Sequence, residues 1–274
     1  MNSSALVFVG IAPHPPVMVP EVGGAMAKDV RASIEAMRGF AERVKASGAE
    51  SVVIVSPHAP LEERAFVAYG GPTLRGDFAN FRAPQATVAA PLDEELLEAV
   101  SKAADEEGYR VVEARASELD HGTAVPLYFL QRNGWEGSVV ALGYCFLPDE
   151  DHVRFGACLK RAIETTGRPA AFVASGDLSH RLKRGAPAGF HPDAHEFDEE
   201  VVGAVRANAP ARIKEIDPAL RRLAGECGYR SMLVALGVAS EGANACEVLS
   251  YEAPFGVGYL VAQLARAAST GAQL

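Results

Sequence analysis

Two kinds of hydrophobic pattern alternate along the chain. Continuous apolar runs of strand length recur in segments such as LVFVGI, SVVIVS and AAFVAS, and such runs are typical of strands buried on both faces of a parallel sheet. Between them lie longer segments with apolar residues three or four positions apart. Residues 25–46 are the clearest case, with Val30, Ile34 and Met37 on one face, and this spacing predicts a helix.

The alternation of the two patterns predicts an α/β fold with a largely parallel central sheet and helices on both faces. Further strands are expected at AFVAYG, YRVVEA and SVVALGY, and two β-like runs, ACEVLSYEA and FGVGYLVAQLA, close the chain. No repeat or linker interrupts the order, so we expect one domain over residues 1–274. Residues 70–91 have no clear period and predict a loop or a bent strand over a site.

The totals exclude several classes of protein. A formal net charge of −9 argues against electrostatic binding to nucleic acid or to anionic lipid. No apolar run reaches the roughly 18 residues that a membrane-spanning helix needs. The four cysteines form no CxxC pair, and a chain of this length does not need disulfides to stabilise its core. We therefore expect a soluble, cytoplasmic protein that binds neither nucleic acid nor membranes.

Three of the seven histidines follow strand-like runs: His14 in APHPP, His58 in SPHAP and His180 in SGDLSH. Ligand sites of open α/β sheets form outside the carboxyl ends of the strands. Imidazole ligates transition metals and also titrates near neutral pH. The placement therefore predicts a shared metal or proton-transfer site, and Asp177 and Ser179 are expected to fix the tautomer of His180.

Other residues extend this candidate site. His121, in LDHGT, is expected at the start of a helix that Asp120 or Thr123 caps. A facial iron triad also needs a carboxylate. Glu226 is a candidate for this carboxylate, because it stands between Gly225 and Gly228, among small residues that are not typical of an exposed glutamate. Cys227 and Asp177 are the alternative ligands.

The remaining histidines have weaker signals. His152 lies in the first turn of an acidic helix and is expected at the surface, as are His191 and His195 in an acidic segment. No GxGxxG, GxxxxGK[ST], GxSxG or HExxH motif is present. A Ser/His hydrolase stays open as an alternative, although no serine lies in a nucleophile-elbow context.

At these residues the chain resembles the class III extradiol ring-cleavage dioxygenase family, typified by the catalytic subunit of protocatechuate 4,5-dioxygenase. The matching segments lie in order between positions 11 and 231: IAPHPP, VSPHAP, LDHGTAVPL, ASGDLSHR and GECGYRS. The similarity is closest to the dioxygenase-like domain found beside the AMMECR1 domain and to Memo-like proteins.

The resemblance implies a non-haem Fe(II) enzyme that cleaves a catecholic ring with O2, with zinc as a metal that can replace iron on isolation. It implies His14, His58 and Glu226 as metal ligands, His180 as the acid/base residue, and His121 near the substrate oxygens. It also implies a homo-oligomer acting in the catabolism of aromatic compounds.

Two other functions stay open beside this one. The same residues can serve a metal-dependent enzyme on a non-catechol substrate, or a non-catalytic Memo-like binding protein with a residual metal site. In Memo-like relatives a cysteine in a CG pair similar to Cys227-Gly228 is the metal ligand.

Overall fold

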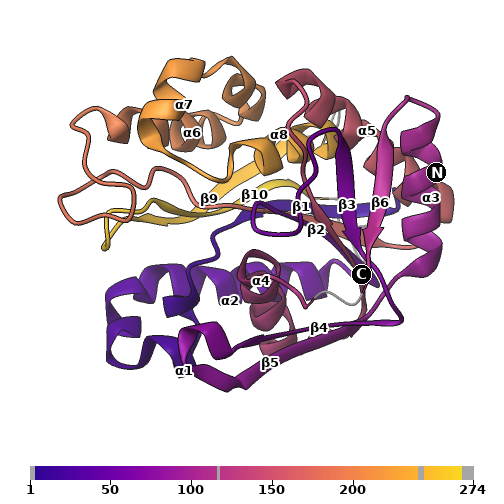
Figure 1. Cartoon of the computed structure of the whole chain (residues 1–274), viewed down its shortest axis with the longest axis horizontal. Helices are drawn as coiled ribbons and strands as arrows, with labels where there is room; N and C mark the ends of the chain where they lie inside the picture. Colours follow the sequence, from indigo (N-terminus) through magenta and orange to yellow (C-terminus); the bar gives the residue numbers. More distant parts are fainter. Residues whose placement is uncertain (1–3, 116–117, 240–243, 267–274) are drawn as a thin grey trace, which may run out of the picture.

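A computed structural model describes residues 4–115, 118–239 and 244–266. Its centre is a large β-sheet (Figure 1). The sheet has eight strands in the order β6-β3-β7-β2-β8-β1-β10-β9. The strands are β1 (Leu6–Ala12), β2 (Ser51–Ser56), β3 (Ala65–Tyr69), β6 (Arg110–Ala114), β7 (Ser138–Gly143), β8 (Ala170–Ser175), β9 (Asn244–Glu252) and β10 (Tyr259–Arg266).

Neighbouring strands in the middle of the sheet, β7, β2, β8 and β1, are all parallel. The direction reverses between β7 and β3 on one side and between β1 and β10 on the other. The expected largely parallel sheet is therefore confirmed, with antiparallel strands added towards its ends. Strand β2 is buried at every residue, as its uninterrupted apolar run predicts.

Helices cover both faces of the sheet, so the chain has the predicted single-domain α/β architecture (Figure 1). One core contains residues of α3, α5, α6 and α8, and the other contains residues of α2 and α4. The helices are α1 (Pro20–Gly23), α2 (Arg31–Ala46), α3 (Glu94–Asp105), α4 (His121–Arg132), α5 (Asp149–Thr166), α6 (Ala194–Arg206), α7 (Pro218–Ala224) and α8 (Tyr229–Ala239).

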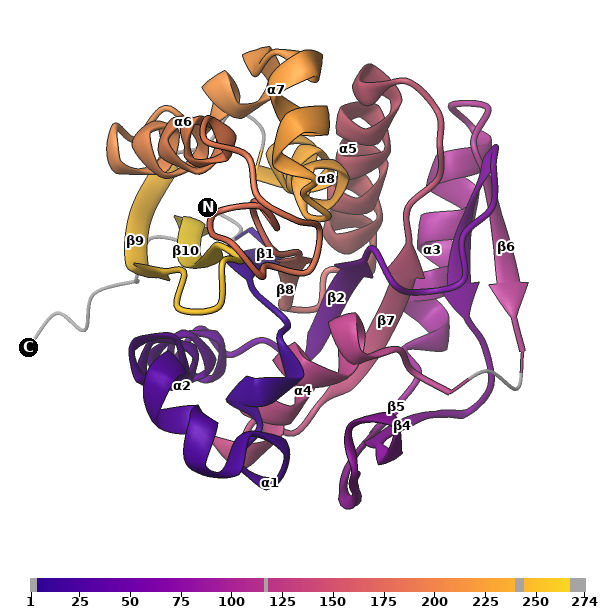
Figure 2. The same cartoon turned by 60° about the vertical axis from the view of Figure 1, so that its left-hand side comes forward.

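The irregular stretch at residues 70–91 is a β-hairpin rather than a loop. Strands β4 (Thr73–Phe78) and β5 (Ala83–Pro91) pair antiparallel and form a separate two-stranded sheet beside α4 (Figure 2). Buried and exposed residues alternate in both strands, because only one face of the hairpin packs on the protein. Its Gly, Pro and Ala residues hide this alternation in the sequence.

His152 corrects a second expectation. Its side chain is fully buried, not at the surface, and its two ring nitrogens lie 3.0 Å from the carbonyl oxygens of Pro148 and Cys145. The ring packs against Phe66 and Tyr144. The acidic residues of this first turn occupy the outer face of α5, whereas His152 takes the inner face, so the local charge pattern was misleading.

Helices α5 and α8 cross at a point where neither has a side chain. A Cβ on Gly156 would lie 2.1 Å from the Val234 carbonyl oxygen, and a Cβ on Gly237 would lie 1.9 Å from the Val153 carbonyl oxygen. Backbone atoms cannot yield as a flexible side chain can, so this crossing requires both glycines.

We therefore expect Gly156→Ala to lower the free energy of unfolding by about 1–3 kcal/mol or more, since the added methyl group overpacks the helix crossing. Gly39→Ala in α2 is the matched control, because a Cβ there has no atom within 4 Å. That change should stabilise the protein by about 0.5–1 kcal/mol. Urea unfolding measures both, and equal stability of the two variants would contradict the close crossing.

Candidate metal centre

Three imidazoles meet at the carboxyl-end edge of the central strands. His14 follows β1, His58 follows β2 and His121 is the first residue of α4. One ligand atom from each lies within 4.8 Å of the others, and this is the group with metal-binding spacing among the described residues. The Nε2 atoms of His14 and His58 are 3.1 Å apart, and the rings of His58 and His121 are stacked at 4.3 Å.

Hydrogen bonds around Ser175 determine which nitrogen of His14 faces this group. The Ser175 hydroxyl donates to the Gly122 carbonyl oxygen over 2.5 Å and lies 2.9 Å from His14 Nδ1. Because its proton is already used, the hydroxyl can only accept from Nδ1–H. Neutral His14 therefore presents a bare Nε2 lone pair to His58, the arrangement that metal-binding histidines use.

Asp120 joins the two segments that carry the other imidazoles. One of its carboxylate oxygens accepts hydrogen bonds from the Ser56 hydroxyl and the Thr123 N–H, and the other accepts from the Tyr69 and Thr123 hydroxyls. Asp120 thus caps α4, as expected, and ties its start to the end of β2. His121 begins α4 and His58 follows β2, so this carboxylate holds together the segments that carry the two stacked rings.

The environment keeps these imidazoles neutral. Burial, followed by repulsion from His58, His121 and His180, lowers the pKa of His14 well below its ordinary value. Burial and the charge of His58 lower the pKa of His121 to about 4. Burial also lowers the pKa of His58, against the opposing effect of Asp120. Neutral imidazoles whose ring nitrogens lie this close together fit a divalent transition metal.

Asp177 and Cys227 also lie close to the His14 Nε2 atom that faces His58. The Asp177 carboxylate accepts the His14 backbone N–H over 3.0 Å, and its second oxygen is 3.9 Å from His14 Nε2. Cys227 Sγ lies 3.7 Å from the same Nε2 and accepts the Asp177 N–H over 3.3 Å. Burial raises the pKa of Asp177 to about 7 and that of the Cys227 thiol well above its usual value.

Glu226 is placed differently from its neighbour. Its carboxylate accepts the Tyr229 N–H over 2.6 Å at the start of α8 and does not belong to the histidine group. Burial raises its pKa to about 7. Of the two adjacent residues, the structure brings the sulfur of Cys227, and not the carboxylate of Glu226, next to His14.

Two glycines explain how Cys227 approaches this site. A Cβ on Gly176 would lie 2.1 Å from Gly228 Cα, so the two backbones touch. The Gly228 N–H donates to the Asp177 carbonyl oxygen over 3.0 Å. The glycines of this segment therefore allow the backbone at Gly228 to touch the backbone at Gly176 next to the site.

His180 completes the set of histidines at this edge. It lies in the irregular segment between β8 and α6, and its charge contributes to the lowered pKa of His14. Burial lowers the pKa of His180 itself, against the opposing effect of the Leu178 and Gly225 backbone, and within the described part of the chain its buried Nδ1 has no hydrogen-bond partner of good geometry. Asp177 and Ser179 bond elsewhere, so the expectation that they fix the His180 tautomer was wrong.

Ser175 and Phe81 are two residues of the site that were not predicted from the sequence. Ser175 is the polar end of an otherwise apolar strand, and that break in the pattern is the one signal it offered. Phe81 lies in the short turn that joins β4 to β5, and its ring centroid is 5.3 Å from that of His121. The hairpin therefore does reach the site, as expected for this stretch.

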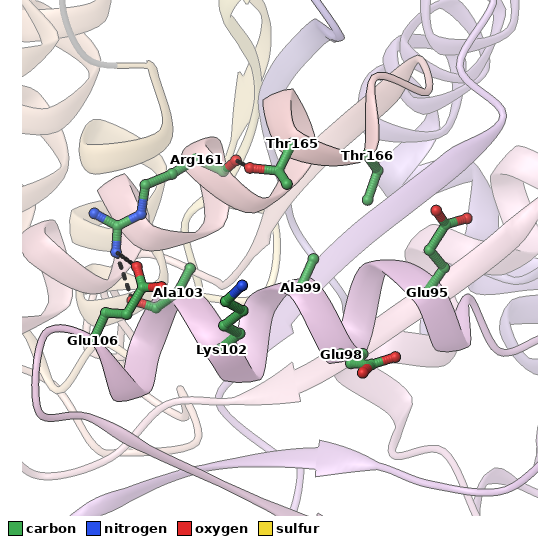
Figure 3. A pocket seen from close by; sticks show the side chains of 9 residues that line it. All are labelled: Glu95, Glu98, Ala99, Lys102, Ala103, Glu106, Arg161, Thr165 and Thr166. Atoms are coloured by element: carbon green, nitrogen blue, oxygen red, sulfur yellow. Dashed lines mark hydrogen bonds and ion pairs between the residues drawn. The ribbon is translucent and has the colours of Figure 1, made fainter.

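A cleft of about 290 Å³ lies elsewhere, between α3 and α5 (Figure 3). Its rim residue Arg161 lies 3.6 Å from Glu106 and 3.2 Å from Glu107, and no histidine or cysteine lines the cleft. Because Arg161 is paired with glutamates and no imidazole or thiol lines the cleft, it does not repeat the donor set of the histidine group.

An α/β sheet with neutral imidazoles converging at its carboxyl-end edge defines a candidate metal-dependent protein. The chain matches the family of the catalytic LigB subunit of aromatic ring-opening dioxygenase over residues 9–262. It therefore belongs to this family, which is one of dioxygenases acting on aromatic rings. No helix of the described residues has the length and apolar character to cross a membrane.

Two further proteins are similar to this chain. Protein CA_C1420 of Clostridium acetobutylicum is 33% identical over 265 residues, which cover 93% of this chain and 56% of that protein. The chain thus spans about half the length of this curated relative. A crystal structure of the uncharacterized protein JW3007 from Escherichia coli K12 shares the fold, with a TM-score of 0.63 and 18% identity over 94% of this chain and 100% of that one.

Removing the Ser175 hydroxyl tests the orientation of His14. We expect Ser175→Ala to weaken metal binding about 10- to 100-fold, because His14 Nδ1–H loses its acceptor and the ring loses its fixed tautomer. Titration calorimetry with Fe(II) or Zn(II) measures the affinity, and Ser101→Ala, whose hydroxyl bonds only its own helix, is the control. Wild-type affinity in Ser175→Ala would show that this hydrogen bond does not prepare the site.

The raised pKa of Glu226 predicts a pH-dependent stability in the metal-free protein. The folded protein holds its proton up to a pKa of about 7, whereas the unfolded chain releases it near the ordinary value, so this residue's contribution to stability is lost as the pH rises between the two values. Glu226→Gln removes this loss. The variant should melt at a higher temperature than the wild type at about pH 8 and at an equal temperature near pH 4.5.

Thermal unfolding at both pH values decides the matter, with Glu98→Gln at an exposed position of α3 as the control. A difference of the opposite sign, larger in acid, would mean that Glu226 is ionised in the folded protein.

Proposed function

We propose that this chain is a non-haem Fe(II)-dependent extradiol dioxygenase that cleaves the ring of a catecholic substrate with O2. The observation that carries the proposal is the 3.1 Å distance between the Nε2 atoms of His14 and His58, beside His121, in a member of a ring-opening dioxygenase family. We propose that the whole chain, residues 1–274, forms one catalytic domain.

In this proposal His14 and His58 hold the iron, and Glu226 supplies the carboxylate ligand. Among the described residues Glu226 accepts one hydrogen bond, from the Tyr229 N–H to one carboxylate oxygen, and the proposal assigns the other oxygen to the metal. When bound, the metal supplies a template for the substrate hydroxyls and for O2, together with electron transfer between them.

His180 is the proposed acid/base residue. A base must be unprotonated at the working pH, and burial, which lowers the pKa of His180, keeps it so. His180 takes a proton from a substrate hydroxyl and later returns it to the opened ring. His121 lies between the ligand pair and Phe81, and its low pKa suits a neutral hydrogen-bonding partner for a substrate oxygen.

One observation favours a second function: a metal-dependent reaction on a non-catechol substrate. The thiol of Cys227, 3.7 Å from His14 Nε2, is nearer to the ligand pair than the Glu226 carboxylate is. A thiolate is a softer donor than a carboxylate and selects other metals and chemistry. The identity of the third ligand therefore separates the two functions. A cytoplasmic location and a homo-oligomeric state remain predictions of the sequence.

Metal retention identifies the ligands. We expect His14→Ala and His58→Ala to lose iron under conditions in which the wild type retains it, since each removes one of a small set of donors. For the dioxygenase, Glu226→Ala releases iron and Cys227→Ala retains it. The reverse pattern would assign the sulfur as ligand and favour the second function. Equilibrium dialysis followed by metal analysis measures all four variants.

Turnover tests the reaction itself. Protein loaded anaerobically with Fe(II) should consume O2 with at least one member of a catechol panel and form the yellow ring-fission product. His180→Gln should retain iron and lower kcat about 100-fold or more, whereas the same change at the exposed His195 should not. Absence of turnover with every catechol, from protein with verified iron, would refute the dioxygenase.

A further inference from the structure

The polar groups that face the ring of His180 belong to the backbone of Leu178 and Gly225. Its Nδ1 is buried and has no hydrogen-bond partner of good geometry among the described residues. His180 also lies in a segment outside any helix or strand. The orientation of its imidazole therefore depends on how firmly the backbone on either side is held.

Asp198 of α6 is the side chain that holds this backbone. One carboxylate oxygen accepts the N–H of Ser179, the residue before His180, over 2.8 Å. The other accepts the hydroxyl of Tyr251 in β9, also over 2.8 Å. Asp198 is only 1% exposed, and an unpaired N–H buried at Ser179 would be unfavourable.

The same backbone is paired with Gly258, just before β10. The Leu178 N–H donates to the Gly258 carbonyl oxygen over 2.8 Å, and the Gly258 N–H donates to the Ser179 carbonyl oxygen over 2.9 Å. A Cβ on Gly258 would lie 1.9 Å from an Asp198 carboxylate oxygen. The carboxylate therefore fits only because residue 258 has no side chain, and three separate parts of the chain converge on this point.

We propose that Asp198, which accepts a hydrogen bond from Tyr251 and packs against Gly258, is the positioning residue for His180. The inference rests on the proposed function, in which His180 transfers protons, and Asp198 acts through the backbone of Ser179 without touching the substrate. A backbone held on one side by Asp198 and on the other by the His180 N–H to Ala224 carbonyl bond, 3.0 Å long, places the imidazole at the edge of the metal centre.

The test compares Asp198→Ala with Asp198→Asn in the iron-loaded full chain. The alanine variant loses the acceptor for Ser179, and the asparagine variant retains one through its amide oxygen. We expect Asp198→Ala to lower kcat on the order of 10- to 100-fold with KM little changed, since displacement of a catalytic group acts on the reacting geometry. Asp198→Asn should recover most of the loss.

A second readout needs no substrate. Nitrogen-15 NMR of the His180 ring, assigned with His180→Gln, is recorded on the chain loaded with Zn(II) as a diamagnetic metal. Asp198→Ala should shift or broaden the ring signals, and Asp198→Asn should restore them. If the wild type turns over no catechol, the proposed function fails, and the ring signals alone decide the positioning role.

Wild-type kcat together with unchanged ring signals in Asp198→Ala would overturn the inference, and so would a loss that Asp198→Asn does not recover. If Asp198→Ala does not fold, Tyr251→Phe replaces it. That change leaves the bond between Asp198 and Ser179 and removes only the hydrogen bond from the Tyr251 hydroxyl to Asp198. It should lower kcat several-fold and shift the same ring signals, and wild-type values for both would overturn the inference.

Discussion

The hydrogen bond between His14 Nδ1 and the Ser175 hydroxyl joins the ends of two neighbouring strands, β1 and β8, and orients the imidazole on which the site depends. Since Ser175 donates to the Gly122 carbonyl oxygen, it also connects this pair of strands to the first turn of α4. The bond therefore turns the Nε2 of His14 towards His58 and anchors the helix that begins with His121. Through these two bonds Ser175 connects β1, β8 and α4, and with them the segments that carry His14 and His121.

Close backbone contacts set the rest of the site. A Cβ on Gly122 would lie 2.3 Å from the Ser56 hydroxyl oxygen, and the contact between Gly176 and Gly228 brings Cys227 to His14. Burial around these contacts disfavours charge, so the imidazoles are neutral while Asp177 and Glu226 hold their protons nearly to neutral pH. Because burial keeps the imidazoles unprotonated, their nitrogens can bind a cation, which would supply the positive charge that these side chains lack.

Much of this could be predicted from the sequence. The apolar runs gave the strands, and because β2, β8 and β1 are adjacent and parallel, their carboxyl ends brought His14, His58 and His180 to one edge, as the strand pattern predicts. The capping role of Asp120 followed from its place before an apolar helix. The fold class and the family are confirmed, whereas the roles of the site residues stay predictions.

What the sequence could not supply are the contacts between distant segments. The burial of His152 depends on which face of α5 meets the core, and the orientation of His14 depends on Ser175, 161 residues away along the chain. The choice between Glu226 and Cys227 is of the same kind: the two are adjacent in sequence, and only the contact of Gly228 with Gly176 shows which of them faces His14.

Anomalous diffraction at the iron edge, from crystals of the Fe(II)-loaded chain grown without oxygen, tests the central claim most directly. The account predicts one strong iron peak within bonding distance of Nε2 of both His14 and His58, with His14 Nδ1 still bonded to Ser175. An iron peak elsewhere, or iron bound to His14 through Nδ1, would contradict it.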